Sequence, residues 1–374
     1  MNEKYNVRDL FLSLVQIDSH SLQEGEMAAR CKAELESLGL QVTVDKAGEA
    51  LNGQTGNLIA KLPGEPNMPK VLLAAHMDTV RPGESVNPRV DENGVVWSDG
   101  KTVLGADDKA GITAILLALQ EIQQQQLPHG DIQVVFTIAE EIGLQGAKQL
   151  REAQLDAHFG LSLDSGGALG TIAVAGPGQA KFEVTVTGVR AHAGVAPERG
   201  VSAIKVAAQA VASMPHGRID EETTANIGSF VGEAPTNVVA DKVTIIGEAR
   251  SRNPEKRERI LEKIEQAFAQ AAQAAGAKAD FTQTLMYEGF DFPADAPLRK
   301  RIEKALHDSG FTPNPQKVGG GSDANVIQTL GVPILNIGLG YEDIHSTNEH
   351  IALANIEHAA QVAVRFCTLP WDVA

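Results

Sequence analysis

The chain has 374 residues, more than one typical hydrophobic core holds, so we expect a large domain and a smaller second one. Hydrophobic residues make up 43% of it, an ordinary share for a globular protein. With 32 basic and 48 acidic residues the formal net charge is −16, which argues against nucleic-acid and membrane-surface partners because such a chain repels phosphate backbones and anionic lipid. The apolar run Gly111–Leu119 is too short to cross a bilayer.

The chain contains two cysteines, Cys31 and Cys367, and each lies within a helical pattern. Isolated cysteines in such positions are typical of buried thiols in a reducing compartment. Because the segment around Glu3 and Asp9 has no apolar signal core and the cysteines fit a reducing compartment, we expect a cytoplasmic protein.

The first 175 residues alternate between helical and strand patterns. Short apolar runs between helices indicate buried strands. The predicted strands are Val71–Ala75, Gln133–Ala139 and Phe159–Leu163, and the predicted helices are Val7–Ile17, Glu24–Leu38, Gly111–Gln123 and Leu144–Glu152. This alternation predicts an α/β domain with helices on both faces of a mostly parallel sheet.

The pattern changes after Gly176, where strictly alternating residues predict a half-exposed strand over Lys181–Thr187. The order from there is β-α-β-β-α-β, typical of a ferredoxin-like α+β unit. Its remaining elements are predicted over Val201–Ser213, Ala225–Val231, Lys242–Glu248, Pro254–Gln273 and Ala279–Tyr287. The α/β pattern then resumes with Leu298–Ser309, Pro333–Ile337 and Asn355–Cys367. We therefore expect one α/β domain, 1–176 and 289–374, interrupted by an inserted domain over 177–288.

Polar side chains follow the predicted strands at the points where the strands end, which is where open α/β sheets bind ligands. These side chains are His76 and Asp78, Glu140 and Glu141, Asp164, and His345, and Asp107 lies in the loop that opens the next helix. Taken singly, each cluster also fits a helix N-cap, a solvated charge or a hydrogen-bonded core histidine. Together they place much negative charge at one edge of a sheet, which requires a compensating cation.

Histidine and carboxylate groups without a thiolate suit zinc, cobalt or manganese. A catalytic zinc takes about three protein ligands, so the number of candidates predicts two metal ions, with Asp107 able to bridge them. A carboxylate left without a metal, Glu140, is then a natural general base. Asp78 lies two residues beyond His76 and can accept a hydrogen bond from its far ring nitrogen.

Four motifs carry a resemblance to a known family: His76-Met-Asp78-Thr, Gly105-Ala-Asp107-Asp-Lys-Ala-Gly, Ala139-Glu140-Glu141-Ile-Gly and Leu163-Asp164-Ser-Gly-Gly. They resemble the peptidase T branch of a dizinc metallopeptidase family that also holds carboxypeptidase G, carnosinase and aminoacylases. The resemblance implies a zinc-exopeptidase-type mixed sheet with an inserted lid domain. It also implies that His76 and Glu141 hold one zinc, that Asp164 and His345 hold the other, and that Asp107 bridges them. Glu140 would be the general base, with Asp78 supporting His76.

The resemblance extends into the insert. His192, in Gly188-Val-Arg-Ala-His192-Ala-Gly, is similar to a lid histidine that stabilises an oxyanion and that comes from the partner subunit in dimeric relatives. Asn237 resembles a substrate-holding asparagine, and Arg250 resembles an arginine that binds a substrate carboxylate. The alternatives are a turn residue for His192 and a strand-end salt bridge for Arg250. A homodimer through the lid is implied by the resemblance alone.

Asp164 distinguishes branches of that family, because aminopeptidase and dipeptidase relatives place aspartate there and many deacylases place glutamate. We therefore expect a metal-dependent aminopeptidase that acts on short, tripeptide-type substrates. An N-acyl amino-acid deacylase or a carboxypeptidase on the same scaffold is the alternative. A non-catalytic relative should have lost a ligand or the base, and none is missing from this sequence.

Overall fold

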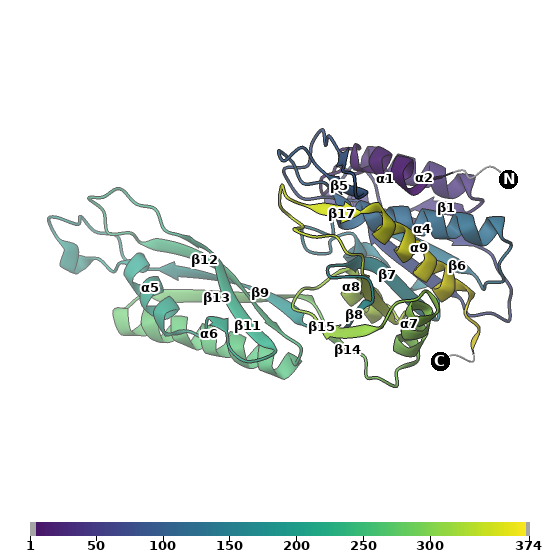
Figure 1. Ribbon diagram of the computed structural model, residues 1–374. Helices are drawn as coiled ribbons and strands as arrows, with labels where there is room; N and C mark the ends of the chain where they lie inside the picture. Colours follow the sequence, from purple (N-terminus) through teal and green to yellow (C-terminus); the bar gives the residue numbers. More distant parts are fainter. Residues whose placement is uncertain (1–4, 372–374) are drawn as a thin grey trace. The chain divides into compact units, whose positions relative to one another are not determined.

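The computed structural model describes residues 5–371, and the chain forms two compact units. The larger unit comprises the chain up to Val174, Phe292–Lys317 and the chain from Ser322 onward. The smaller unit comprises Ala175–Asp291 and Val318–Gly321, and most of it is coloured teal to green in Figure 1.

A mixed sheet forms the centre of the larger unit. In spatial order its strands are β1 (Gln41–Val44), β2 (Leu58–Leu62), β6 (Ile132–Thr137), β3 (Val71–His76), β7 (Phe159–Ser165), β16 (Ile334–Gly338) and β8 (Thr171–Gly176), with β15 (Asn314–Lys317) paired to β8. The four strands β6, β3, β7 and β16 are parallel to one another. Because their carboxyl ends meet at one edge, residues that follow them in the sequence gather there.

Helices cover both faces of this sheet, as expected. They are α1 (Val7–Val15), α2 (Gly25–Ser37), α3 (Ala47–Leu51), α4 (Ala106–Gln124), α7 (Pro297–Asp308), α8 (Asp323–Thr329) and α9 (Leu353–Thr368). The helix α4 packs against β3, β7 and α9. The helix α8 packs on the face that presents Leu72, Ala74 and Val135. A small sheet of β4 (Arg89–Val90), β5 (Val95–Trp97) and β17 (His350–Ala352) completes the unit.

The helix expected over Leu144–Glu152 is wrong. The segment instead forms two short 3₁₀ turns, η1 (Ala147–Gln149) and η2 (Glu152–Gln154). Leu144 has a positive φ of 60°, and the backbone N–H of Gly146 bonds to the carbonyl of Ile138 at 3.0 Å. A Cβ on Gly146 would lie 2.1 Å from that carbonyl oxygen. Backbone bonding to the end of β6 therefore replaces the helical ladder.

The smaller unit has the expected ferredoxin-like architecture. Its elements are β9 (Gly178–Thr187), η3 (Pro197–Arg199), α5 (Ala203–Ser213), β10 (Gly217–Arg218), β11 (Thr223–Val231), β12 (Lys242–Ser251), α6 (Pro254–Ala275) and β13 (Lys278–Tyr287). The antiparallel sheet has the order β10-β11-β12-β9-β13. The short strand β14 (Phe290–Asp291) pairs with the end of β8.

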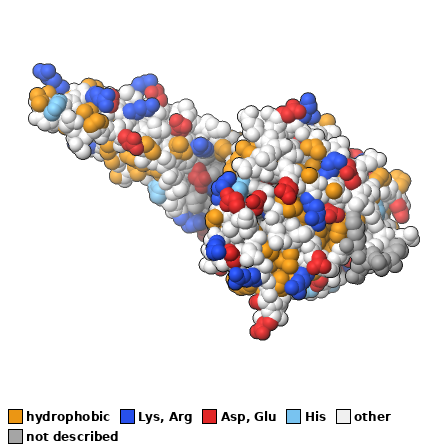
Figure 2. All heavy atoms as spheres, turned by 90° about the horizontal axis from the view of Figure 1, so that it is seen from above, with side chains coloured by type: hydrophobic (Ala, Val, Ile, Leu, Met, Phe, Trp, Pro, Cys, Tyr) orange, Lys and Arg blue, Asp and Glu red, His pale blue; other side chains and the backbone are white. Residues whose placement is uncertain are grey.

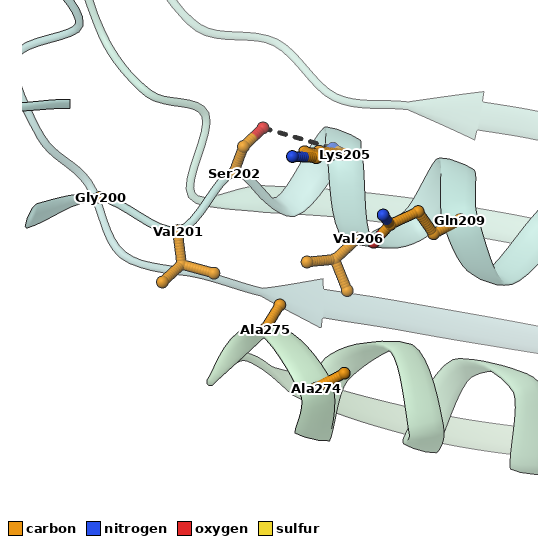
Figure 3. Close-up of a pocket in the computed structure, with 8 residues that line it drawn as sticks. All are labelled: Gly200, Val201, Ser202, Lys205, Val206, Gln209, Ala274 and Ala275. Atoms are coloured by element: carbon orange, nitrogen blue, oxygen red, sulfur yellow. Dashed lines mark hydrogen bonds between the residues drawn. The ribbon is translucent and has the colours of Figure 1, made fainter. Parts of the chain in front are cut away.

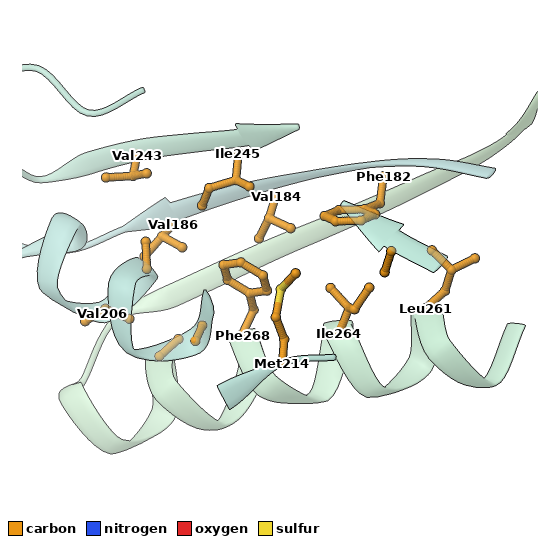
Figure 4. Close-up of a cluster of buried hydrophobic side chains, with 14 of the residues drawn as sticks. Phe182, Val184, Val186, Val206, Met214, Val243, Ile245, Leu261, Ile264 and Phe268 are labelled. Carbon is orange, nitrogen blue, oxygen red and sulfur yellow. The ribbon is translucent and has the colours of Figure 1, made fainter. Parts of the chain in front are cut away.

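The core of the smaller unit lies between its sheet and its two helices. Figure 4 shows Phe182, Val184 and Val186 of β9 pointing toward Ile264 and Phe268 of α6. Alternate residues of β9 are buried in this way, as expected for a strand with one face on a core. A pocket of about 400 Å³ beside α5 and the end of α6 is lined by Lys205, Gln209 and small residues (Figure 3), and none of the predicted site residues lines it.

Among the described residues, no helix has both the length and the apolar character needed to span a membrane. Cys31 and Cys367 are both buried free thiols, as expected. On the face shown in Figure 2, acidic and basic side chains are interspersed.

Candidate metal centre

The five predicted ligands come together at the carboxyl edge of the larger unit's sheet. His76 is the last residue of β3, and Asp164 lies near the end of β7. Glu141 follows β6, Asp107 lies in the first turn of α4, and His345 lies between β16 and β17. Four of the five are buried or nearly so, whereas the His345 side chain is 49% exposed.

Asp107 lies at the centre of this group. Its Oδ1 is 3.1 Å from Nε2 of His76, and its Oδ2 is 3.5 Å from Nε2 of His345. The same His345 nitrogen is 3.0 Å from Oε1 of Glu141, and Nε2 of His76 is 3.8 Å from Oδ1 of Asp164. The two oxygens of Asp107 therefore face two different histidines.

These contacts pair His76 with Asp164, and His345 with Glu141, on the two sides of Asp107. The family resemblance implied a different pairing, of His76 with Glu141 and of Asp164 with His345. The reason for the observed pairing is topological, because β3 and β7 are neighbouring parallel strands, and their register, with Ala74 opposite Ser162, brings His76 beside Asp164 two residues further on. Glu141 and His345 both lie on loops that follow strands.

The carboxylates of this group have too little positive charge around them to balance their own. Burial and nearby carboxylates raise the pKa of Asp164 well above its usual value, although His76 opposes the shift. Hydrogen bonds to Asp107 and Glu141 raise the pKa of His345 to about 10. Burial disfavours a charged His76, but bonds to Asp107 and Asp78 hold its pKa well above the usual range. Bound cations would relieve the repulsion among these carboxylates.

Glu140 is a carboxylate beside the ligands, and the two candidate ligand groups found among the described residues do not include it. Burial raises its pKa well above the usual value, and the charges of Asp164 and Asp323 add to the shift against the influence of His76. Its backbone N–H donates to Oδ1 of Asp78 at 2.9 Å.

Asp78 is buried and binds the chain around Glu140 more closely than it binds the His76 ring. Its Oδ2 accepts from the backbone N–H of Glu141 at 3.2 Å and from the Ser21 hydroxyl at 2.6 Å. The Nδ1 atom of His76 lies 2.9 Å from the backbone carbonyl of Asp78 and 3.4 Å from its Oδ1. The backbone oxygen of Asp78 is thus the nearer acceptor for the ring, and its carboxylate positions Glu140 and Glu141.

Sequence reasoning missed two acidic residues of this region. Asp108 is buried, and its carboxylate accepts the backbone N–H groups of His76 at 3.3 Å and Gly111 at 3.1 Å. Glu349 is also buried, and it accepts backbone N–H groups from Gly105 and Asp107. The available signals were the doubled aspartate at 107–108 and a carboxylate four residues beyond His345. Neither pattern indicates that the side chain points inward.

Asp323, at the start of α8, reaches the same edge of the sheet. It is 4% exposed and accepts a hydrogen bond from the Thr137 hydroxyl at the end of β6. Burial raises its pKa to about 6.

Two of the predicted substrate-binding residues, His192 and Asn237, lie side by side in the smaller unit. His192 forms a bridge with Val238, and the backbone N–H of Ala193 donates to the Asn237 carbonyl at 2.8 Å. The backbone N–H groups of Gly194 and Val195 both donate to Nδ1 of His192 at 3.2 Å. In the neutral ring the proton therefore lies on Nε2, which leaves that atom as a hydrogen-bond donor.

Arg250 lies near the other end of β12, away from His192 and Asn237. Its Nε donates to Oε1 of Glu248 at 2.7 Å, and its Nη2 donates to Oε2 at 3.1 Å. Its Nη1 donates to the Tyr287 hydroxyl at 3.3 Å and to the Gly319 carbonyl at 3.4 Å. The guanidinium thus has an internal carboxylate partner.

The donor atoms fit divalent metal ions. Single ligand atoms from His76, Asp107 and Glu141 lie within 4.8 Å of one another, and so do atoms from His76, Asp108 and Asp164. Imidazole nitrogens and carboxylate oxygens are the donors that zinc and similar ions accept. A group of metal ligands at the carboxyl edge of parallel strands, with a further carboxylate beside it, is typical of metal-dependent hydrolases.

Comparisons with known proteins agree with this class. The profile of Peptidase family M20/M25/M40 matches residues 72–368. The Bacillus subtilis (strain 168) protein YqjE is 43% identical over 364 residues, which is 97% of this chain and 98% of that protein. The chain therefore belongs to peptidase family M20/M25/M40.

Two solved structures are similar over nearly the whole chain. The aminopeptidase PepT from Bacillus cereus ATCC 10987 has a TM-score of 0.90 at 42% identity, over 97% of each chain. A tripeptidase from Staphylococcus aureus subsp. aureus Mu50 has a TM-score of 0.93 at 40% identity, again over 97% of each.

Proposed function

We propose that this protein is a metal-dependent aminopeptidase that hydrolyses short peptides, including tripeptides. The observation that carries the proposal is the placement of Glu140, a half-buried carboxylate beside the predicted metal ligands, with its backbone held by Asp78. The similarity to an aminopeptidase and a tripeptidase, at 42% and 40% identity over nearly the whole chain, supports the substrate class.

Two ions would be held on the two sides of Asp107. His76 and Asp164 would hold one ion, and Glu141 and His345 would hold the other, in line with the contacts of these side chains. Zinc is the ion we favour, with cobalt and manganese as alternatives, because the donors are imidazole and carboxylate. Ions bound there would lower the pKa of a water molecule and polarise the scissile carbonyl.

Glu140 would act as the general base. One of its carboxylate oxygens takes a proton from the attacking water and then delivers that proton to the amine that leaves. The hydrogen bond from its backbone N–H to Asp78 keeps the residue in place during both transfers. Asp78 is thus a positioning residue for Glu140.

The predicted substrate-binding residues lie in the smaller unit. We propose that Nε2 of His192, a donor in the neutral ring, stabilises the oxyanion, and that Asn237 helps to hold the substrate. We propose that Arg250 binds the substrate's terminal carboxylate.

We further propose that the protein is a homodimer through the smaller unit. His192 and Asn237 lie beyond the Lys242 end of β12, whereas Arg250 lies near its Ser251 end. A ten-residue strand is roughly 30 Å long, about three times the length of an extended tripeptide. If all three residues bind one short peptide, they therefore come from two copies of the chain.

Two buried free cysteines are in keeping with the cytoplasmic location that we propose.

The test combines a variant with a substrate panel. We expect Glu140→Gln to bind metal as the wild type does and to lose about 10²–10⁴-fold in turnover. The matched control is Glu152→Gln, which makes the same change at an exposed site. Near-wild-type turnover of the Glu140 variant would refute the mechanism. Faster hydrolysis of N-blocked than of N-free peptides would favour a deacylase or carboxypeptidase instead.

A further inference from the structure

Glu349 is a buried carboxylate whose two oxygens each bind a backbone amide of a distant turn. Its Oε2 accepts from the N–H of Gly105 at 2.8 Å, and its Oε1 accepts from the N–H of Asp107 at 3.0 Å. The residue is 1% exposed, and more than 240 positions separate it from that turn in the sequence.

The turn at Gly105 and Asp107 needs hydrogen-bond acceptors from elsewhere in the chain because the first turn of α4 is irregular. The first amides of a helix lack acceptors within the helix, and a side chain at the N-cap usually supplies one. Here the N-cap is Gly105, with a φ of 76° and no side chain to accept a bond, and Asp107 has non-helical angles of −83° and 101°. Glu349 thus caps α4 from a remote loop, and in doing so it fixes the backbone of Asp107.

Glu349 also belongs to the loop that presents His345. Its own N–H donates to the carbonyl of Ser346 at 3.2 Å, and a bridge between Glu342 and His350 closes the loop. His345 has a left-handed backbone with a φ of 61°, a conformation that its surroundings must maintain. One side chain therefore joins the turn of Asp107 to the loop of His345.

We infer that Glu349 is a positioning residue that sets the affinity and geometry of the metal centre without binding a metal itself. This inference rests on the metal centre of the proposed function but not on the identity of the substrate. Residues that orient metal ligands typically change metal affinity or activity by about 10–100-fold when they are replaced. Loss of the two hydrogen bonds that Glu349 accepts would release the backbone of Asp107 and the loop of His345 together. Oδ2 of Asp107 and Nε2 of His345 lie 3.5 Å apart.

The experiment is a metal titration of the full-length, metal-free protein. Zinc affinity is measured by competition with a chromophoric chelator, and the visible spectrum of the cobalt-loaded protein reports the coordination geometry. For Glu349→Gln, which keeps the size of the side chain but turns one acceptor into a donor, we expect about 10–100-fold weaker zinc binding and an altered cobalt spectrum.

The matched control is Asp45→Asn in the same unit. Asp45 also accepts two backbone N–H groups, from Ala47 at 2.9 Å and Asn57 at 2.8 Å, and its replacement should reduce stability while leaving zinc affinity unchanged. If Glu349→Gln does not fold, Glu349→Asp is measured in the same way, since its shorter side chain cannot reach both amides. A folded variant with wild-type affinity and spectrum overturns the inference. A wild-type protein that binds no metal refutes the proposed function instead.

Discussion

The carboxylate of Asp78 accepts the backbone N–H of Glu140, with 2.9 Å between Oδ1 and N. Its other oxygen accepts the N–H of Glu141 and the hydroxyl of Ser21. One buried side chain therefore orients both the proposed base and the ligand that follows it.

Replacing Asp78 with asparagine should reduce turnover more than substrate binding. The amide group of asparagine keeps one acceptor oxygen and places an N–H donor at the other position, so one of the backbone N–H groups of Glu140 and Glu141 loses its acceptor. We expect kcat to fall about 10–100-fold with a much smaller change in KM. Steady-state kinetics on an N-free tripeptide would measure this, and an equal loss in Ser21→Ala would show that the hydroxyl alone holds the clamp.

Metal removal should both inactivate and destabilise the protein. Without ions, the carboxylates of Asp107, Asp108 and Asp164 repel one another in a buried group, which is one cause of the raised pKa of Asp164. A ligand present at 1,000 times its Kd stabilises the folded state by about 4 kcal/mol. We therefore expect zinc to raise the melting temperature of the metal-free protein. Magnesium at the same concentration is the control, because it prefers sites made of oxygen ligands alone. Equal stabilisation by both ions would count against a site that uses His76 and His345.

The Glu248–Arg250 pair should weaken the binding of substrates that have a free terminal carboxylate. Arg250 donates to both oxygens of Glu248, so a substrate carboxylate has to compete with that internal partner. We expect Glu248→Gln to lower KM about two- to five-fold for such peptides, since partly exposed ion pairs contribute about 1 kcal/mol or less. Peptides with an amidated C-terminus should show no change.

The control for this prediction is Glu183→Gln, which makes the same charge change on the neighbouring strand β9. An increase in KM for Glu248→Gln would show instead that Glu248 holds Arg250 in its binding position.

Glu24 should make the stability of the protein depend on pH. Burial, followed by the charge of Asp78, raises its pKa from 4.5 to about 7. Because the folded state then binds this proton more tightly than the unfolded state, the stabilising contribution is complete below pH 4.5 and is lost as the pH rises through 7.

The measured quantity is the free energy of unfolding of the metal-free wild type minus that of metal-free Glu24→Gln. This difference should fall by about 1–3 kcal/mol as the pH rises from 5 to 8. Urea unfolding at several pH values would measure it. A difference that rises with pH would contradict the assigned direction of the shift.

Much of the fold follows from local pattern. The continuous apolar runs that become β3, β6 and β7 are recognisable because both faces of those strands are buried. Where a segment's backbone bonds are decided by distant partners, the pattern misleads. Residues 144–152 form short turns because Gly146 binds the end of β6, and nothing in the local periodicity contains that contact.

The sequence by itself determined which chemical groups are available and that they follow buried strands, since hydrophobic runs fix the strands and parallel strands end at one edge. Only the tertiary structure decided which groups face one another. The neighbouring strands β3 and β7 set His76 against Asp164, and the loops that follow β6 and β16 bring Glu141 and His345 together. The folding of a remote loop brings Glu349 to the amides of Gly105 and Asp107. The physical reason is that ligand pairing and remote capping depend on contacts between segments far apart in the chain, which residue spacing does not encode.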